Sequence, residues 1–291
     1  MTNLVYAGAF MALLGVILAA ALAVASRRLH VVEDPRIDEV EGMLPKSNCG
    51  ACGTAGCRNF AEKVVAGEIM PAQCTVNAPA QNEAIASLLG VDAGSVEKRV
   101  ARLACAGGRH VAFLRARYAG LGSCRAAAVV SGGGKDCAWG CLGLADCATV
   151  CDFDAIHMNV HGLPVVEADK CTACNDCVEV CPKELFSLVP VSQKLWVACK
   201  NLADGETAEA ACEVSCTACG KCVADAEPGL IKLVDNLAVI DYAQNERAAK
   251  LAIERCPTGA IVWFNDPDTP VKGAEAKKIL RQDELPLRAF S

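Results

Sequence analysis

Twenty cysteines among 291 residues are the side chains of this chain best suited to chemistry. Their clearest run is CTACNDCVEVCP, from Cys171 to Pro182, with the spacing C-x2-C-x2-C-x3-C-P. In this motif three cysteines on one tight loop hold a 4Fe–4S cluster, and the fourth binds the other cluster of a pair. Structural zinc sites use two separated pairs of ligands instead. The triple with its Cys-Pro end therefore favours iron–sulfur chemistry.

The preceding run, CAWGCLGLADCATVC, contains the same ferredoxin motif with one ligand missing. When Cys151 is aligned with Cys181, Leu144 falls at the second ligand position, and Cys137 is the nearest substitute. In paired clusters, the fourth cysteine of each run binds the cluster that is held by the other run, so these two runs together predict two 4Fe–4S clusters. Cluster 1 takes Cys137, Cys141, Cys147 and Cys181, and cluster 2 takes Cys151, Cys171, Cys174 and Cys177.

A second ferredoxin triple starts at Cys216, but its fourth position is Ala226. The matching later run, NERAAKLAIERCP, keeps only its closing cysteine, and glutamate or alanine stands at its other three ligand positions. By the pairing rule, all four missing ligands belong to the same cluster. The sequence therefore predicts a one-cluster module, whose cluster 3 is held by Cys216, Cys219, Cys222 and Cys256.

Eight further cysteines lie outside these motifs. One group has the spacing C-x2-C-x4-C-x16-C among small residues that let the backbone approach a cluster, with zinc as the alternative. This N-terminal 4Fe–4S site uses Cys49, Cys52, Cys57 and Cys74. The last four are either buried apolar thiols or the ligands of a fifth cluster, and they are Cys105, Cys124, Cys199 and Cys212. Cys212 matches Cys137 of the first motif and could compete with Cys219 for cluster 3. We therefore expect four 4Fe–4S clusters, or five if the last group binds one.

The N-terminal segment predicts a membrane helix. No charged residue occurs from Thr2 to Ser26, and about 20 apolar residues span a bilayer. Arg27 and Arg28 follow at once, whereas no Lys or Arg precedes, which predicts a single-pass anchor in the cytoplasmic membrane with the remaining chain in the cytoplasm. A cleaved signal peptide is the alternative, but the segment lacks the positive charge that should precede it. Cytoplasmic thiols stay reduced, so metal ligation is favoured over disulfides.

The expected fold class is α+β, because short strands around tight turns alternate with cysteine loops. Only 4% of the residues are aromatic, so bound metal must replace part of a conventional core. The predicted order is a transmembrane anchor at 1–26, a linker at 27–45, a four-cysteine Fe–S domain at 46–95, a basic connecting segment at 96–131, a two-cluster ferredoxin-like module at 132–190, a degenerate one-cluster ferredoxin-like module at 191–263 and a C-terminal surface tail at 264–291.

The segment from Glu97 to Arg125 carries seven basic residues against one acid, although the net charge of the chain is −6. These cations either form a solvated face and balance nearby metal–thiolate charge, or form a docking patch for an acidic partner. No Ser-His-Asp arrangement, phosphate loop or dinucleotide motif is present in the sequence. We therefore predict an electron carrier without catalytic residues and without a nucleic-acid partner.

The order of an apolar N-terminal segment, LPKSNCGACGTAGC, CAWGCLGLADC and CTACNDCVEVCP resembles the B subunit of the Rnf complex over residues 1 to about 263. Rnf complexes are membrane-bound ferredoxin:NAD⁺ oxidoreductases that translocate Na⁺ or H⁺. The resemblance implies that the chain accepts electrons from reduced ferredoxin and passes them to other subunits of the complex. It also implies that the ferredoxin modules receive electrons and that the N-terminal site releases them. Longer members often have two clusters in the second module, so the missing cluster leaves open whether this module lies on the main route.

Two other functions are compatible with the sequence. One is an Fe–S subunit of a different membrane complex, such as a hydrogenase or another reductase. The other is a zinc-stabilised, membrane-anchored interaction scaffold, which would contain zinc and no iron or sulfide.

Overall fold

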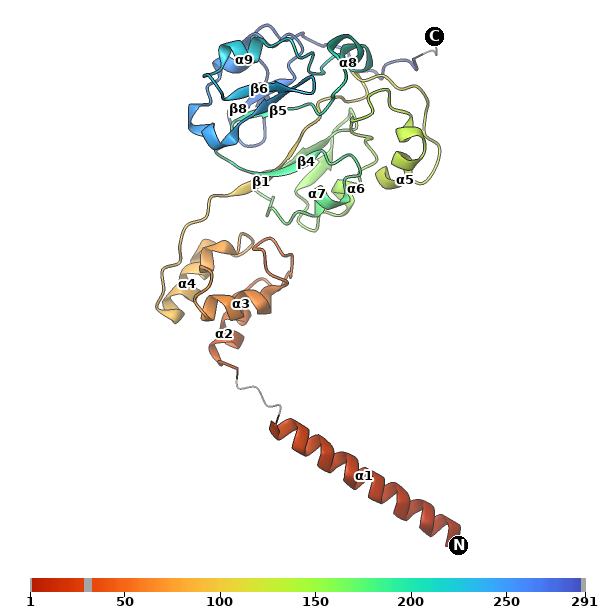
Figure 1. Ribbon diagram of the computed structural model, residues 1–291, viewed down its shortest axis with the longest axis vertical. Coiled ribbons are helices and arrows are strands. Elements are labelled where there is room, and N and C mark those ends of the chain that lie inside the picture. Colours follow the sequence, from red (N-terminus) through yellow and green to blue (C-terminus); the bar gives the residue numbers. More distant parts are fainter. Residues whose placement is uncertain (1, 29–32, 289–291) are drawn as a thin grey trace.

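A computed structural model describes residues 2–28 and 33–288 (Figure 1). Helix α1 covers Thr2–Arg28. Its part from Gly8 to Arg28 is long and apolar enough to cross a membrane by length and composition, with a mean hydropathy of 2.5. Large apolar side chains on this helix, such as Phe10 and Leu22, are exposed. The helix therefore remains a candidate membrane anchor.

The next unit is a small helical domain that carries the first four cysteines. It contains α2 (Arg36–Met43), α3 (Cys57–Val65), the 3-10 helix η1 (Pro71–Gln73) and α4 (Pro79–Leu89). Val40, Phe60 and Ile85 fill its core together with two of the cysteines. Helix α4 ends at Gly90, whose φ of 68° is left-handed. Glycine ends the helix here because it adopts that conformation without strain.

The first ferredoxin-like module pairs β1 (Arg99–Leu103) with β4 (Phe186–Pro190) in antiparallel register. Between them lie the hairpin of β2 (Ile156–Met158) and β3 (Pro164–Val166) and the short helices α6 (Asp146–Thr149) and α7 (Asp176–Val180). Helix α5 (Cys124–Val129) and the 3-10 helix η2 (Ser131–Gly134) lie in the long insertion that follows β1. Strand β1 thus belongs to this module, although its residues fall in the predicted connecting segment.

The second module repeats this order. Strand β5 (Leu195–Val197) pairs with β8 (Ile261–Phe264), and β8 also pairs with β9 (Pro270–Val271). Helix α8 (Gly205–Ala211) lies in the insertion after β5, and α9 (Lys221–Asp225) follows it. The hairpin of β6 (Ile231–Val234) and β7 (Leu237–Ile240), the 3-10 helix η3 (Tyr242–Arg247) and α10 (Leu251–Glu254) complete the module. In each module the elements therefore follow the same order along the chain: strand, insertion, helix, hairpin, helix and strand.

The two modules lie side by side and share apolar contacts (Figure 1). The indole N–H of Trp196 in β5 donates to the Leu103 carbonyl of β1 at 2.9 Å. The Arg102 guanidinium lies 3.4 Å from the ring centre of Phe264 in β8. Burial lowers the pKa of Arg102 to about 10. Its guanidinium nitrogens have no hydrogen-bond partner among the described residues, so this cation is held mainly by the aromatic face.

The C-terminal residues return to the modules, which differs from the predicted surface tail. Leu285 is buried, and its N–H donates to the Arg109 carbonyl at 3.0 Å. Arg288 binds the buried carboxylate of Asp136 at 2.5 Å. Sequence reasoning misses this because the segment is polar overall and its anchors are isolated.

Candidate iron–sulfur sites

Three cysteine loops share one backbone conformation. In the loops that start at Cys141, Cys171 and Cys216, the residues two and four positions after the cysteine have positive φ: Gly143 and Ala145, Ala173 and Asn175, Ala218 and Gly220. This twice-reversed turn lets successive side chains of the loop point toward a common centre. The Cys141 loop is therefore built like the other two, although Leu144 occupies its second ligand position.

The predicted ligands of cluster 2 are mutual neighbours. Burial, together with the charges of Cys171, Cys174, Cys147 and Cys151, raises the pKa of the Cys177 thiol to about 12. The Cys151 charge also acts on Cys174, whose pKa burial raises to about 11. The four thiols that the ferredoxin pairing rule assigns to one cluster are therefore neighbours, with Cys147 beside them.

The N-terminal site and cluster 3 each correspond to one cavity. The first is lined by Cys49, Cys52, Cys57 and Cys74. The second is lined by Cys216, Cys219, Cys222 and Cys256. Cys256 follows α10 and reaches the cavity from a segment about thirty residues after the triple. Cys219, and not Cys212, thus lines the cluster 3 cavity.

Cys124 lies at the vacant ligand position of the Cys141 loop. Burial raises the pKa of its thiol, while hydrogen bonds from the backbone of Asp146 and Leu144 lower it. The Asp146 carboxylate accepts the Cys124 backbone N–H at 2.9 Å, which holds the start of α5 against α6. The charges of Cys124 and Cys181 both act on Cys147. Cys124 therefore joins Cys141, Cys147 and Cys181.

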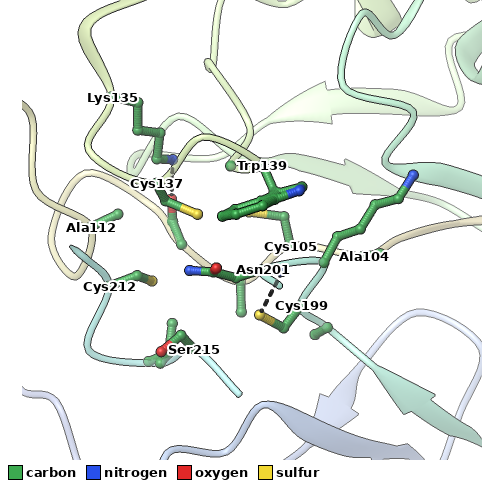
Figure 2. A pocket seen from close by; sticks show the side chains of 16 residues that line it. Ala104, Cys105, Ala112, Lys135, Cys137, Trp139, Cys199, Asn201, Cys212 and Ser215 are labelled. Atoms are coloured by element: carbon green, nitrogen blue, oxygen red, sulfur yellow. Dashed lines mark hydrogen bonds between the residues drawn. The ribbon is translucent and has the colours of Figure 1, made fainter. Parts of the chain in front are cut away.

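Cys137 lies instead in a cavity between the modules (Figure 2). This central cavity is lined by Cys105, Cys137, Cys199 and Cys212. Figure 2 shows these four side chains coming from separate segments toward one space, with Trp139 beside them. A Cβ added to Gly107 would lie 3.1 Å from Cys212 Sγ and 3.7 Å from Cys105 Sγ. The absence of a side chain at Gly107 thus keeps this space open.

The sets of cysteines that the structure brings together differ from the predicted sets by the exchange of Cys124 and Cys137. Of the predicted cluster 1 set, Cys141, Cys147 and Cys181 come together and Cys137 does not. Of the predicted fifth set, Cys105, Cys199 and Cys212 come together and Cys124 does not. The short sequence separation of Cys137 and Cys141 is misleading, because the intervening turn sends their thiols into different cavities. An alignment of the modules gives a signal: Cys105 and Cys199 each stand two residues after the first strand of their module.

The cavities fit iron–sulfur clusters in their chemistry. Sulfur atoms accept backbone N–H groups, as at Cys105 from Cys141 at 3.4 Å and at Cys181 from Leu185 at 3.4 Å. Such bonds stabilise thiolates and tune cluster potentials. Thr172 in the cluster 2 loop and Ser215 at the central cavity have buried hydroxyls without a partner among residues 2–28 and 33–288. Each hydroxyl could donate to a cluster sulfur.

A single metal ion fits less well. Within the part of the chain that the structure describes, no three His, Cys, Asp or Glu side chains converge closely enough to hold one ion. The wider spacing suits a cluster, in which each thiolate binds a different iron. Burial also raises the pKa of several of these thiols, as for Cys222 to about 12. The positive charge of bound iron compensates this cost, because metal ligation requires the thiolate.

Most cations of the basic segment have partners inside the chain. Arg115 binds the Asp136 carboxylate, and Arg117 lies 3.6 Å from Glu284. The Arg99 guanidinium donates to the Leu188 carbonyl at 2.7 Å. These contacts favour the structural interpretation of the segment over a dedicated docking patch.

Comparisons with known proteins agree with this geometry. Residues 44–76 match the family described as "Putative Fe-S cluster", and residues 164–186 match the "4Fe-4S binding domain". The fold and the cysteine loops thus define an iron–sulfur electron-transfer protein. The relatives narrow the class: the chain belongs to the B subunits of ion-translocating ferredoxin:NAD⁺ oxidoreductase (Rnf) complexes.

Three relatives carry this assignment. The chain is 39% identical over 85% of its length to the B subunit of the Na(+)-translocating ferredoxin:NAD(+) oxidoreductase complex of Acetobacterium woodii, and covers 74% of that protein. It is 38% identical over 86% of its length to the proton-translocating counterpart of Clostridium ljungdahlii, of which it covers 89%. It is 33% identical over 87% of its length to the B subunit of the ion-translocating oxidoreductase complex of Methanosarcina acetivorans, of which it covers 96%.

Proposed function

We propose that this chain accepts electrons from reduced ferredoxin and relays them to membrane redox subunits of an Rnf-type complex for NAD⁺ reduction coupled to Na⁺ or H⁺ translocation. The observation that carries the proposal is the close succession of thiol groups through both modules to the N-terminal domain. Relatives of similar identity are named for different coupling ions, so the coupling ion stays open.

The N-terminal site is our candidate for the output. The Thr75 hydroxyl, next to Cys74, donates to the Thr172 carbonyl, next to Cys171, at 2.7 Å. This contact supports direct electron exchange between cluster 2 and the N-terminal site. The N-terminal domain also precedes the modules in the chain and follows α1, the candidate anchor. With the anchor in the cytoplasmic membrane and the body on its cytoplasmic side, electrons would leave near the membrane.

The second module is our candidate for the input. Of the twenty cysteines, which all lie in described residues, Cys219 alone is exposed. Its neighbours on the β6–β7 hairpin include Leu233 and Val234, which are also exposed. An exposed ligand brings cluster 3 close to a docked ferredoxin.

Bound clusters would supply reversible one-electron chemistry. The protein's own residues keep the ligands at fixed positions, exclude water from the buried thiols and donate N–H groups to sulfur. Each transfer oxidises one ferredoxin by one electron, and no covalent bond of the chain forms or breaks. Two such electrons and one proton convert NAD⁺ to NADH on a partner subunit.

The test uses anaerobic membranes that contain the assembled complex. Addition of reduced ferredoxin should produce reduced-cluster EPR signals from this protein, followed by NADH. If dithionite reduces the clusters but reduced ferredoxin does not, the proposed donor is wrong. Co-purification with a hydrogenase would support the alternative of an Fe–S subunit in another complex, and zinc without iron or sulfide would support the scaffold.

A further inference from the structure

We propose that Cys105, Cys137, Cys199 and Cys212 hold a fifth 4Fe–4S cluster that links cluster 3 to cluster 1, and that Cys124 completes cluster 1. The linking role rests on the proposed relay function, whereas the ligand assignment does not.

Each module supplies one equivalent pair of these ligands. Cys105 and Cys199 each stand two residues after the first strand of their module. Cys137 and Cys212 each stand four residues before the first cysteine of the ferredoxin loop. The strand ends are joined directly, because the Ala106 N–H donates to the Ala198 carbonyl at 2.9 Å. Packing of the two modules against each other thus brings both pairs to one cavity.

The surroundings of the central cavity fit a cluster. Like the N-terminal cavity and the cluster 3 cavity, it is lined by four cysteines. Cys137 and Cys212 are 9% and 6% exposed, and Ser215 is 2% exposed. The Ser215 hydroxyl, which has no partner in the described part of the chain, and the open face of Gly107 both border this space. Apolar packing of four thiols would explain neither feature.

The same hydrogen bond connects the central site to the cluster on each side. The Cys141 N–H donates to Cys105 Sγ at 3.4 Å, and the Cys216 N–H donates to Cys199 Sγ at 3.4 Å. Cys141 and Cys216 are the first ligands of clusters 1 and 3. A ligand of the central site therefore touches a ligand of each neighbouring cluster. One electron at a time would pass between them without any change in covalent bonding.

Cys124 follows from the same assignment. With Cys137 in the central site, the Cys141 loop lacks a fourth thiol. The Cys124 backbone N–H donates to the Asp146 carboxylate at 2.9 Å, directly before the ligand Cys147, and Leu144 stands where the other two loops carry Cys174 and Cys219. All twenty cysteines are then used in five sets of four.

The experiment is anaerobic iron and acid-labile sulfide analysis of the full chain in detergent, with a reductive EPR titration. The native protein should contain about 20 irons and about 20 sulfides per chain. The double variant Cys105→Ala/Cys199→Ala removes one ligand from each module and should contain about 16 of each. Trp139→Phe, which changes the same cavity without removing a thiol, should keep about 20.

Several results would overturn the assignment. About 16 irons in the native protein, with or without one zinc, would exclude a fifth cluster however the variants fold. An unchanged iron count in Cys105→Ala/Cys199→Ala would exclude these ligands. If that variant loses all iron through misfolding, Cys137→Ser in the full chain provides the second arm. Its EPR titration should change one signal and leave the signal of cluster 1 intact; loss of the cluster 1 signal would restore Cys137 to cluster 1.

The linking role has a separate readout. After rapid mixing with reduced ferredoxin, freeze-quenched samples of Cys105→Ala/Cys199→Ala should show cluster 3 reduced and the N-terminal site still oxidised. Equal reduction of the N-terminal site in variant and native protein would refute the link. A native protein that ferredoxin fails to reduce would refute the proposed function but leave the iron counts and the ligand assignment standing.

Discussion

Replacement of Cys256 tests whether a lone Cys-Pro completes a distant cluster. Cys256 is 8% exposed and lines one cavity with Cys216, Cys219 and Cys222. In Cys256→Ala these three thiolates remain, and each can bind one iron. The expected loss is therefore at least about one and at most about four of about 20 irons per chain. The EPR signal of cluster 3 should disappear or change its shape, because one iron has lost its protein ligand.

Ala249→Ser is the matched control. Ala249 occupies the ligand position that aligns with Cys174 of the first module, in the same segment as Cys256. It is exposed, and its loop lacks the pair of positive φ angles found in the three cysteine loops. The substitution should therefore cost no iron. Equal iron loss in both variants would mean that the segment matters for folding rather than for ligation, and full iron with an unchanged spectrum in Cys256→Ala would refute ligation outright.

Three further variants probe the supports of these sites. Asp146→Ala removes the acceptor for the N–H groups of Cys124 and Arg125. Because loss of such a cap costs about 1 kcal/mol, thermal unfolding should begin at a lower temperature and cluster 1 should lose iron faster to a chelator. An unchanged rate of iron loss would contradict this role of Asp146. Asp136→Asn weakens the contacts of a buried carboxylate with Arg115 and Arg288. Residues 274–288 should become cleavable by protease, and full protection would show that the other contacts of the segment, such as Arg281 with Glu213, are sufficient to hold it. Trp196→Phe deletes the hydrogen bond to Leu103 across the module interface and should cost about 1 kcal/mol. Chemical denaturation of the iron-loaded protein measures this loss, and no change would mean that this hydrogen bond does not help to hold the modules together.

Sequence spacing predicts the sites whose ligands lie on one loop. Cys171, Cys174 and Cys177 are three residues apart, so one backbone conformation brings them together, and the ferredoxin pattern implies it. The α4 end at Gly90 is equally local. The central site is different, because its ligands meet only when two modules pack through Trp196 and Phe264. Such long-range contacts leave no spacing signal, and proximity in sequence then favours Cys137 over Cys124 for cluster 1.

The position of the missing cluster bears on the route of the electrons. In the first module, the proposed ligands of cluster 1 border the central site through Cys141, and the loop proposed for cluster 2 borders the N-terminal domain through Thr172. In the second module, cluster 3 borders the central site through Cys199 and Cys216. The vacant positions around Ala249 correspond to cluster 2, which is the member of the pair that lies away from the module interface. If the central cluster exists, the missing cluster would stand at the outer end of the series. Its loss then shortens the series without interrupting it, so the second module can lie on the main route rather than on a side branch.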